Sequence, residues 1–207
     1  NEIKNISNIE KFFEIKPEGN WEGKIILNEI IEPPDEIIHE LFKIRQKKNK
    51  PFFDDKTQLD LNSLWLSSLI SSHYVLPKEG YLKLAEDLYS KIEKKFMKEN
   101  LFHSFSKDIV FLEDYAFLIQ ALLDLNEATM NIQYKLKAKE LAKKTIELFY
   151  LKEKKIFQKN KIQNNDIFIA PIDISDNTTP NGNSIMLINL TRLGMIENAT
   201  ELASSRL

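Results

Sequence analysis

Hydrophobic stripes with helical spacing run along this chain from Pro33 onward. Apolar positions recur three and four residues apart, which is the spacing of one face of a helix. Residues 33–48 also begin with prolines and acids, which suit a helix start. The same criteria predict further helices at 59–76, 77–97, 111–130 and 131–150, one from 182, and a last one after a break near Gly194.

The predicted helices alternate in character. Residues 59–76 and 111–130 are apolar almost throughout, whereas 77–97 and 131–150 are charged and carry a single apolar stripe. This alternation is a repeat of αα-hairpins, and a third apolar helix begins near 182. Apolar helices inside, with amphipathic helices wrapped outside them, favour an all-α toroid or a helical solenoid. A compact bundle would have shorter and more uniform loops.

The first 32 residues lack this pattern, so the chain is predicted to divide into an extended lead-in, 1–32, and a toroid domain, 33–207. The lead-in has one possible short strand, KIIL at 24–27. Short β-hairpins are predicted in the connecting loops: residues 101–111 indicate a short hairpin or an irregular loop, and the alternating residues at 155–170 a second hairpin. Because the chain starts without Met and ends within a helical pattern, we expect it to be a fragment of a longer protein.

Composition excludes several classes of function. The 207 residues contain no cysteine, so disulfides and thiol redox chemistry are excluded. The net charge of −2, with basic and acidic residues mixed, argues against a nucleic-acid partner. No apolar run approaches the roughly 20 residues of a membrane span, and no signal peptide is evident, so we expect a cytoplasmic protein. Zinc-hydrolase, phosphate-loop and serine-hydrolase motifs are missing, and we expect neither a metal nor a cofactor.

Each apolar helix is preceded by a cluster of polar residues. If these helices lie side by side and point the same way, their starts share one rim, to which helix N-termini add free N–H groups and partial positive charge. Such a rim around an apolar funnel would suit a polyhydroxylated ligand. The candidate substrate-binding residues are Asp54, Asp55, Lys56, Asn62, Tyr115, Asn183 and Ser184.

Glu113 and Asp114 are candidate catalytic residues, together with His103 just before the same helix. Carboxyl and imidazole groups can serve as general acids and bases. Consecutive helical residues point about 100° apart, so we expect at most one of the two acids to face the funnel. The alternative is that these polar residues cap helices, since Asp, Asn, Ser and Glu are preferred at helix starts.

Four segments occur in an order that resembles one protein family. They are GNWEGKIIL (19–27), DDK (54–56), LEDYAFLIQALLDLNEAT (112–129) and PNGNS (180–184). The family is typified by spermatogenesis-associated protein 20 and is also called DUF255 or thioredoxin domain-containing proteins. The resemblance covers about residues 12–194. It implies part of an (α/α)6 toroid similar to N-acylglucosamine 2-epimerase and cellobiose 2-epimerase, with a thioredoxin-like domain elsewhere in the parent chain.

The chain departs from the family after DDK. Where the family has Thr-Ser-Trp-Asn-Gly, this chain has Leu59-Asp60-Leu61-Asn62-Ser63, so a tryptophan that could face a ligand is missing. The resemblance implies a funnel that binds or isomerises a small carbohydrate. The alternative is a non-catalytic scaffold or interaction domain that supports the thioredoxin-like domain. Exposed apolar edges of a partial toroid would then favour a homo-oligomer.

Overall fold

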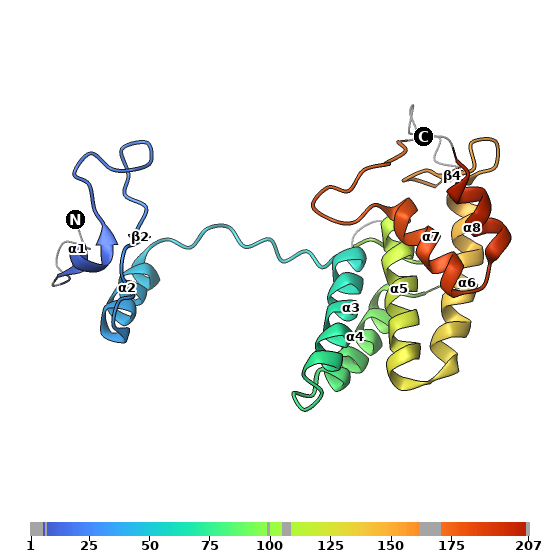
Figure 1. Cartoon of the computed structure of the whole chain (residues 1–207), viewed down its shortest axis with the longest axis horizontal. Helices are drawn as coiled ribbons and strands as arrows, with labels where there is room; N and C mark the ends of the chain where they lie inside the picture. The colour runs from blue at the N-terminus through green and yellow to red at the C-terminus, as the bar shows by residue number, and fades with distance from the viewer. Residues whose placement is uncertain (1–5, 7, 99, 105–108, 162–170, 206–207) are drawn as a thin grey trace. The chain divides into compact units, whose positions relative to one another are not determined.

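The computed structural model describes residues 6, 8–98, 100–104, 109–161 and 171–205. The chain forms two compact units, Asn1–Asp54 and Asp55–Leu207 (Figure 1). The predicted boundary after residue 32 therefore differs from the structure, where the boundary in the sequence lies 22 residues later, after Asp54.

The amino-terminal unit includes the helix that the sequence pattern placed in the toroid. Its elements are α1 (Ile9–Phe12), β1 (Phe13–Glu14), β2 (Asn28–Glu29) and α2 (Asp35–Lys47), with β1 and β2 antiparallel. Ile37 of α2 packs in a small core with residues of the lead-in, Ile6, Ile9 and Phe13. Part of the apolar face of α2 thus packs within this unit, while Ile38 and Phe42 stay exposed.

Residues 24–27, predicted as a short strand, form a loop held by Asn20. Its side chain donates to the backbone oxygen of Ile26 and accepts from the backbone N–H of the same residue, both at 2.7 Å. Gly19 has φ +80°, and a Cβ there would lie 2.6 Å from the backbone oxygen of Lys24. The residues that pair with β1 lie after this turn, at Asn28–Glu29.

The second unit contains, in its described residues, three αα-hairpins. They are α3 (Leu59–Val75) with α4 (Tyr81–Phe96), α5 (Leu112–Thr129) with α6 (Ile132–Phe149), and α7 (Gly182–Arg192) with α8 (Ile196–Ala203). Helix α5 packs against both α3 and α7 (Figure 1). The predicted helices are confirmed to within a few residues. The largest shift is at α4, which begins after a turn that ends at Gly80, where φ is +73°.

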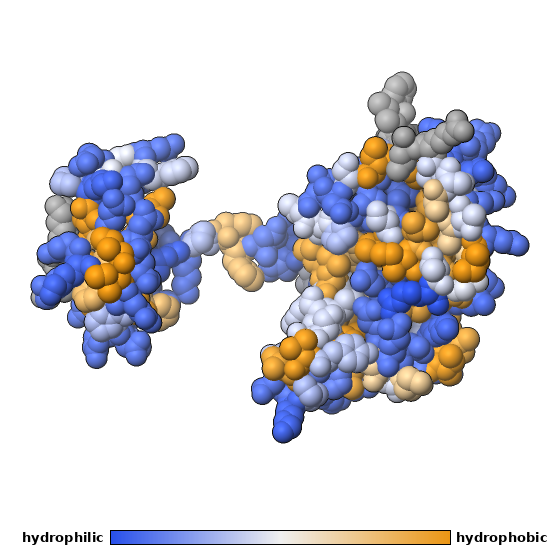
Figure 2. All heavy atoms as spheres, viewed as in Figure 1, coloured by the Kyte–Doolittle hydropathy of each residue, from blue (hydrophilic) through white to orange (hydrophobic). Residues whose placement is uncertain are grey.

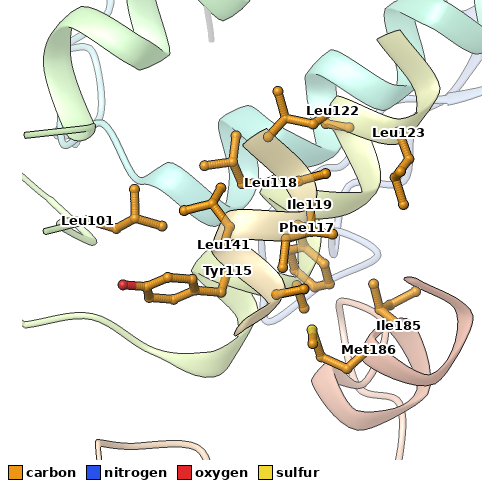
Figure 3. Packing of buried hydrophobic residues seen from close by; sticks show 14 of the residues in the cluster. Leu101, Tyr115, Phe117, Leu118, Ile119, Leu122, Leu123, Leu141, Ile185 and Met186 are labelled. Carbon is orange, nitrogen blue, oxygen red and sulfur yellow. The ribbon is translucent and has the colours of Figure 1, made fainter. Parts of the chain in front are cut away.

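The core of this unit is built around α5, of which eleven residues are buried. Figure 3 shows Phe117 and Ile119 of α5 beside Leu141 of α6 and Ile185 and Met186 of α7. Burying each large apolar side chain contributes about 1.5–3 kcal/mol. Helix α5 is therefore internal, as predicted, whereas α3 is only partly covered and leaves Leu61 and Trp65 exposed.

A short hairpin follows α6. Strands β3 (Tyr150–Leu151) and β4 (Ile156–Phe157) pair antiparallel, with Tyr150 opposite Phe157. The hairpin predicted within 155–170 therefore begins earlier than expected, and residues 162–170 lie outside the described residues. In the loop predicted as a hairpin at 101–111, the backbone N–H of His103 donates to Ile109 O at 2.8 Å, and residues 105–108 are not described.

Large hydrophobic side chains remain exposed in both units, as the orange areas in Figure 2 show. Trp21 and Phe42 in the first unit and Trp65 in the second are each more than half exposed. The predicted homo-oligomer stays a prediction. Within the described residues, no helix is both long enough and apolar enough to cross a membrane.

Candidate functional site

The starts of α3, α5 and α7 meet at one end of the second unit. The backbone N–H of Asp60, in the first turn of α3, donates to Asp114 Oδ1 of α5 at 3.2 Å. On the other side of α5, a Cβ on Gly182 of α7 would lie 2.9 Å from Leu112 Cδ2. The three helices therefore bring their N-terminal turns together, the arrangement on which the predicted rim depends.

A cavity of about 310 Å³ opens beside these helix starts. Polar side chains from α3, α5, the loop before α5 and the loop before α7 surround it. Its lining residues are Gln58, Asp60, His103, Phe111, Glu113, Lys159, Asp173, Ser175, Asn177, Thr178, Thr179, Pro180 and Asn181. Of the three predicted catalytic residues, His103 and Glu113 line it and Asp114 does not.

Asp114 is fully buried and stabilises two helix starts. Its Oδ2 accepts the backbone N–H of Phe111 at 2.8 Å, which caps α5 from the third helical position. Its Oδ1 accepts the N–H of Asp60 at 3.2 Å, which caps α3 from a neighbouring helix. Burial raises the pKa of Asp114, while the hydrogen bonds from His103 and Phe111 act in the opposite direction. Capping, the alternative considered from the sequence, thus applies to Asp114.

His103 is held at both its backbone and its ring. Its backbone oxygen accepts the N–H of Leu59, the first residue of α3, at 2.9 Å. Nδ1 lies 3.0 Å from Asp114 Oδ1, and Nε2 lies 2.9 Å from Gln58 Nε2. The hydrogen bond to Asp114 raises the pKa of His103, with burial acting against it. The ring also packs edge-on against Phe111, at 4.9 Å between centroids.

Glu113 lines the cavity, whereas Asp114, about 100° further round the helix, does not. Its Oε2 is buried and has no hydrogen-bond partner among the described residues. Burial raises the pKa of Glu113, and the nearby Lys159 partly offsets this effect. A half-buried carboxyl of raised pKa in a polar cavity is a group suited to proton transfer.

An ion pair also lines the cavity. Lys159 Nζ lies 3.0 Å from Asp173 Oδ2, and the hydrogen bond to Asp173 raises the pKa of Lys159. The backbone of Lys159 also supports α5, because its oxygen accepts the N–H of Leu112 at 2.9 Å. Sequence reasoning missed Gln58, Lys159 and Asp173, which lie in loops and show no motif.

Asp60, His103 and Asp114 place one possible ligand atom each within 4.8 Å of one another. Such a group could approach a cation. Nδ1 of His103 and Oδ1 of Asp114, however, are already joined by a hydrogen bond, and a protonated Nδ1 has no lone pair for a metal. We therefore interpret these residues as a hydrogen-bonded network.

The asparagine side chains at the start of α7 form hydrogen bonds mainly with backbone groups. Asn183 accepts from Phe157 N at 2.9 Å and donates to Phe157 O at 3.0 Å, which joins α7 to β4. Ser184 is exposed and does not line the cavity. Asn181 caps α7, since its Oδ1 accepts from the backbone N–H groups of Asn183 and Ser184, and it is also part of the cavity lining.

The remaining predicted binding residues lie elsewhere. Asp54 belongs to the amino-terminal unit, while Asp55 and Lys56 are exposed and do not line the cavity. Asn62 donates to the backbone oxygen of Gln58 at 2.7 Å, a contact within the start of its own helix. Tyr115 points into the core toward Leu101 (Figure 3), and burial raises its pKa to about 12.

Comparison with known proteins gives one sequence relative. The chain is 28% identical over 173 residues to an uncharacterised protein of Caenorhabditis elegans, a match that covers 77% of this chain and 23% of that protein. No protein-family profile matches the chain. The chain spans about a quarter of the length of the Caenorhabditis elegans relative.

Solved structures identify the fold. Cellobiose 2-epimerase from Bacillus thermoamylovorans matches with TM-score 0.58 and 20% identity, over 72% of this chain and 44% of that one. A GH76 α-mannanase from Bacteroides thetaiotaomicron matches with TM-score 0.58 and 10% identity, over 81% and 53%. A D-mannose isomerase gives TM-score 0.52 and 13% identity, over 81% and 50%.

These proteins have the (α/α)6 toroid fold, and the second unit has the same architecture of αα-hairpins. The chain spans about half the length of each matched structure.

Proposed function

We propose that the cavity binds a small neutral carbohydrate and isomerises or epimerises it by proton transfer. The observation that carries this proposal is that Glu113 and His103 line one cavity at the starts of the internal helices. The names of the matched structures support it, since they include a sugar epimerase and a sugar isomerase as well as a mannanase.

The size and polarity of the cavity suit a sugar. Its volume of about 310 Å³ lies at the lower end of the range for small-molecule sites. Amide and hydroxyl groups of Gln58, Ser175, Asn177 and Asn181 can exchange hydrogen bonds with sugar hydroxyls. Phe111 offers an apolar ring for the C–H face of the sugar.

The charges favour an unphosphorylated ligand. Asp60, Glu113 and Asp173 place three carboxyl groups in the lining, against Lys159 and His103. Lys159 is already paired with Asp173. A sugar phosphate would therefore meet an acidic cavity without an unpaired lysine in its described lining, and we expect it to bind less tightly than the neutral sugar.

The reaction requires only the movement of protons and electron pairs. A base removes the proton from the carbon next to the carbonyl, and the C–H electron pair forms an enediolate. An acid then returns a proton, to the opposite face for epimerisation or to the neighbouring carbon for isomerisation. Burial raises the pKa of Glu113 toward neutral pH, and the hydrogen bond to Asp114 raises the pKa of His103, so both groups can take part in these proton transfers.

Sugars in D2O provide the test. The chain is incubated with mannose, glucose or cellobiose, and NMR follows deuterium entering C2 and the appearance of the epimer or ketose. We expect exchange with one of these sugars and a loss of about 100-fold or more in Glu113→Gln and His103→Gln.

A matched control is Glu79→Gln, which makes the same chemical change at an exposed position outside the cavity. It should leave exchange unchanged. Cleavage of a mannobiose without exchange at C2 would instead indicate a hydrolase. If no sugar exchanges, is cleaved or raises the melting temperature, the carbohydrate proposal is wrong and a scaffold function is favoured.

A further inference from the structure

The hydrogen bonds of the His103 ring define the role of Asp114. A carboxylate accepts hydrogen bonds and donates none, so the contact of 3.0 Å between Asp114 Oδ1 and His103 Nδ1 requires the proton on Nδ1. In the neutral ring the lone pair is then on Nε2. There the amide nitrogen of Gln58 lies 2.9 Å away, the arrangement expected of a donor facing an acceptor.

We propose that Asp114 is a positioning residue that keeps the proton on Nδ1 of His103, so that Nε2 is the nitrogen that exchanges protons with a ligand in the cavity. This inference deepens the proposed function and rests on it for the identity of the ligand. Its geometric part, the position of the proton, holds in the free protein.

The carboxylate of Asp114 is itself fixed in orientation. Besides His103, it accepts the backbone N–H groups of Phe111 and Asp60, which belong to the starts of two different helices. Its side chain is completely buried. An Asp114 carboxylate held at three points cannot rotate without breaking two helix caps, so the His103 ring is oriented by the fold itself.

The Nε2 position connects this network to the cavity. His103 and Gln58 both line the cavity, whereas Asp114 does not. A sugar hydroxyl that replaces the Gln58 amide would donate to the lone pair on Nε2. His103 could then act as a base in its neutral form and as an acid once Nε2 is protonated, with Nδ1 protonated in both forms.

Other charged groups also act on this ring. Asp60 Oδ1 of α3 lies 3.9 Å from Nδ1, and Glu113 of α5 acts at longer range. Lys159 and Asp173 also line the cavity. Asp60 therefore provides a matched control, because it places a carboxylate near the same nitrogen without the 3.0 Å contact.

Long-range ¹H–¹⁵N NMR of the histidine rings in the free chain tests the proposal. The chain has three histidines, and His103→Gln identifies the signals of His103. We expect the wild-type ring to carry its neutral-form proton on Nδ1. In Asp114→Asn a neutral amide replaces the carboxylate, and its single oxygen cannot accept from Phe111, Asp60 and His103 together. The preference for the proton on Nδ1 should therefore weaken, and the pKa of His103 should fall by about one unit or more.

Asp60→Asn should lower the pKa of His103 less and leave the proton on Nδ1. A wild-type ring with its neutral proton on Nε2 would overturn the proposal, and this measurement stands even if Asp114→Asn does not fold. A folded Asp114→Asn with unchanged proton position and pKa would overturn it as well. None of these outcomes depends on a sugar, so they are separate from failure of the carbohydrate proposal.

Discussion

Gly182, the first residue of α7, and Leu112, the first residue of α5, approach each other so closely that a Cβ on Gly182 would lie 2.9 Å from Leu112 Cδ2. The same Cβ would lie 3.1 Å from Glu113 Oε1. Two sequence segments 70 positions apart, one around Leu112 and the other around Gly182, thus meet beside the cavity. The position of the Glu113 carboxyl depends on the lack of a side chain at Gly182.

Gly182→Ala should therefore disturb both stability and the cavity. We expect overpacking to lower the free energy of unfolding by about 1–3 kcal/mol, measured by urea denaturation. Gly80→Ala is the control, since φ is +73° there and nothing lies within 4 Å of the added Cβ. It should cost about 1 kcal/mol and leave any sugar-induced rise in melting temperature intact. Wild-type stability in Gly182→Ala would show that α5 and α7 are less closely packed.

Asn183→Ala should destabilise the junction of α7 and β4. The substitution leaves the buried N–H and C=O of Phe157 without their partner, which costs about 2 kcal/mol in unfolding free energy. The neighbouring Ser184→Ala should change it by less than about 0.5 kcal/mol, because Ser184 is exposed. Equal effects of the two substitutions in chemical denaturation would contradict a structural role for Asn183.

Glu113→Gln should stabilise the chain at neutral pH, by about 1 kcal/mol, while it removes the proposed activity. Burial raises the pKa of Glu113 above its usual 4.5, so the folded state favours the protonated carboxyl. The resulting stability is fully present below pH 4.5 and is lost as pH rises through the folded pKa. The gain from Gln should thus be large at pH 7 and small at pH 4 in urea titrations. A gain independent of pH would exclude a buried charge as its cause.

His103 should also stabilise the fold more at low pH than at high pH, but over a higher pH range than Glu113. The hydrogen bond to Asp114 raises its pKa above 6.5, so the folded state favours the imidazolium. That contribution is fully present below pH 6.5 and disappears as pH rises through the folded pKa. The difference in unfolding free energy between wild type and His103→Gln should therefore shrink between pH 6 and pH 9. A difference that grows over this range would mean that the imidazolium is disfavoured in the fold.

The sequence predicted most of the helical repeat because its information is local. Apolar residues at helical spacing marked α5 and its buried face, and Gly194, with φ +72°, marked the break between α7 and α8. The division between the units was placed too early. The apolar face of α2 has the same spacing whether it packs on a toroid or on the lead-in, and the structure places Ile37 in one core with Ile6, Ile9 and Phe13 of the lead-in.

The candidate site was only partly predictable. Helical geometry correctly required Glu113 and Asp114 to diverge, but it could not say which of them faces the cavity. That depends on α3, whose Asp60 N–H binds Asp114. Gln58 and Lys159 were missed because loops bring them to the cavity without any spacing rule. Asn183 was expected in the site, yet its side chain is hydrogen-bonded to the backbone N–H and C=O of Phe157.

The proposed function requires a neutral sugar to occupy the cavity at the starts of α3, α5 and α7. Chemical-shift mapping by ¹H–¹⁵N NMR, with mannose, glucose or cellobiose added to the whole chain, tests it most directly. We predict that shifts concentrate at cavity residues such as Gln58, His103, Glu113 and Asn181 and that the matching sugar phosphates give weaker shifts. Shifts confined to residues outside the cavity, or none with any sugar, would contradict the claim.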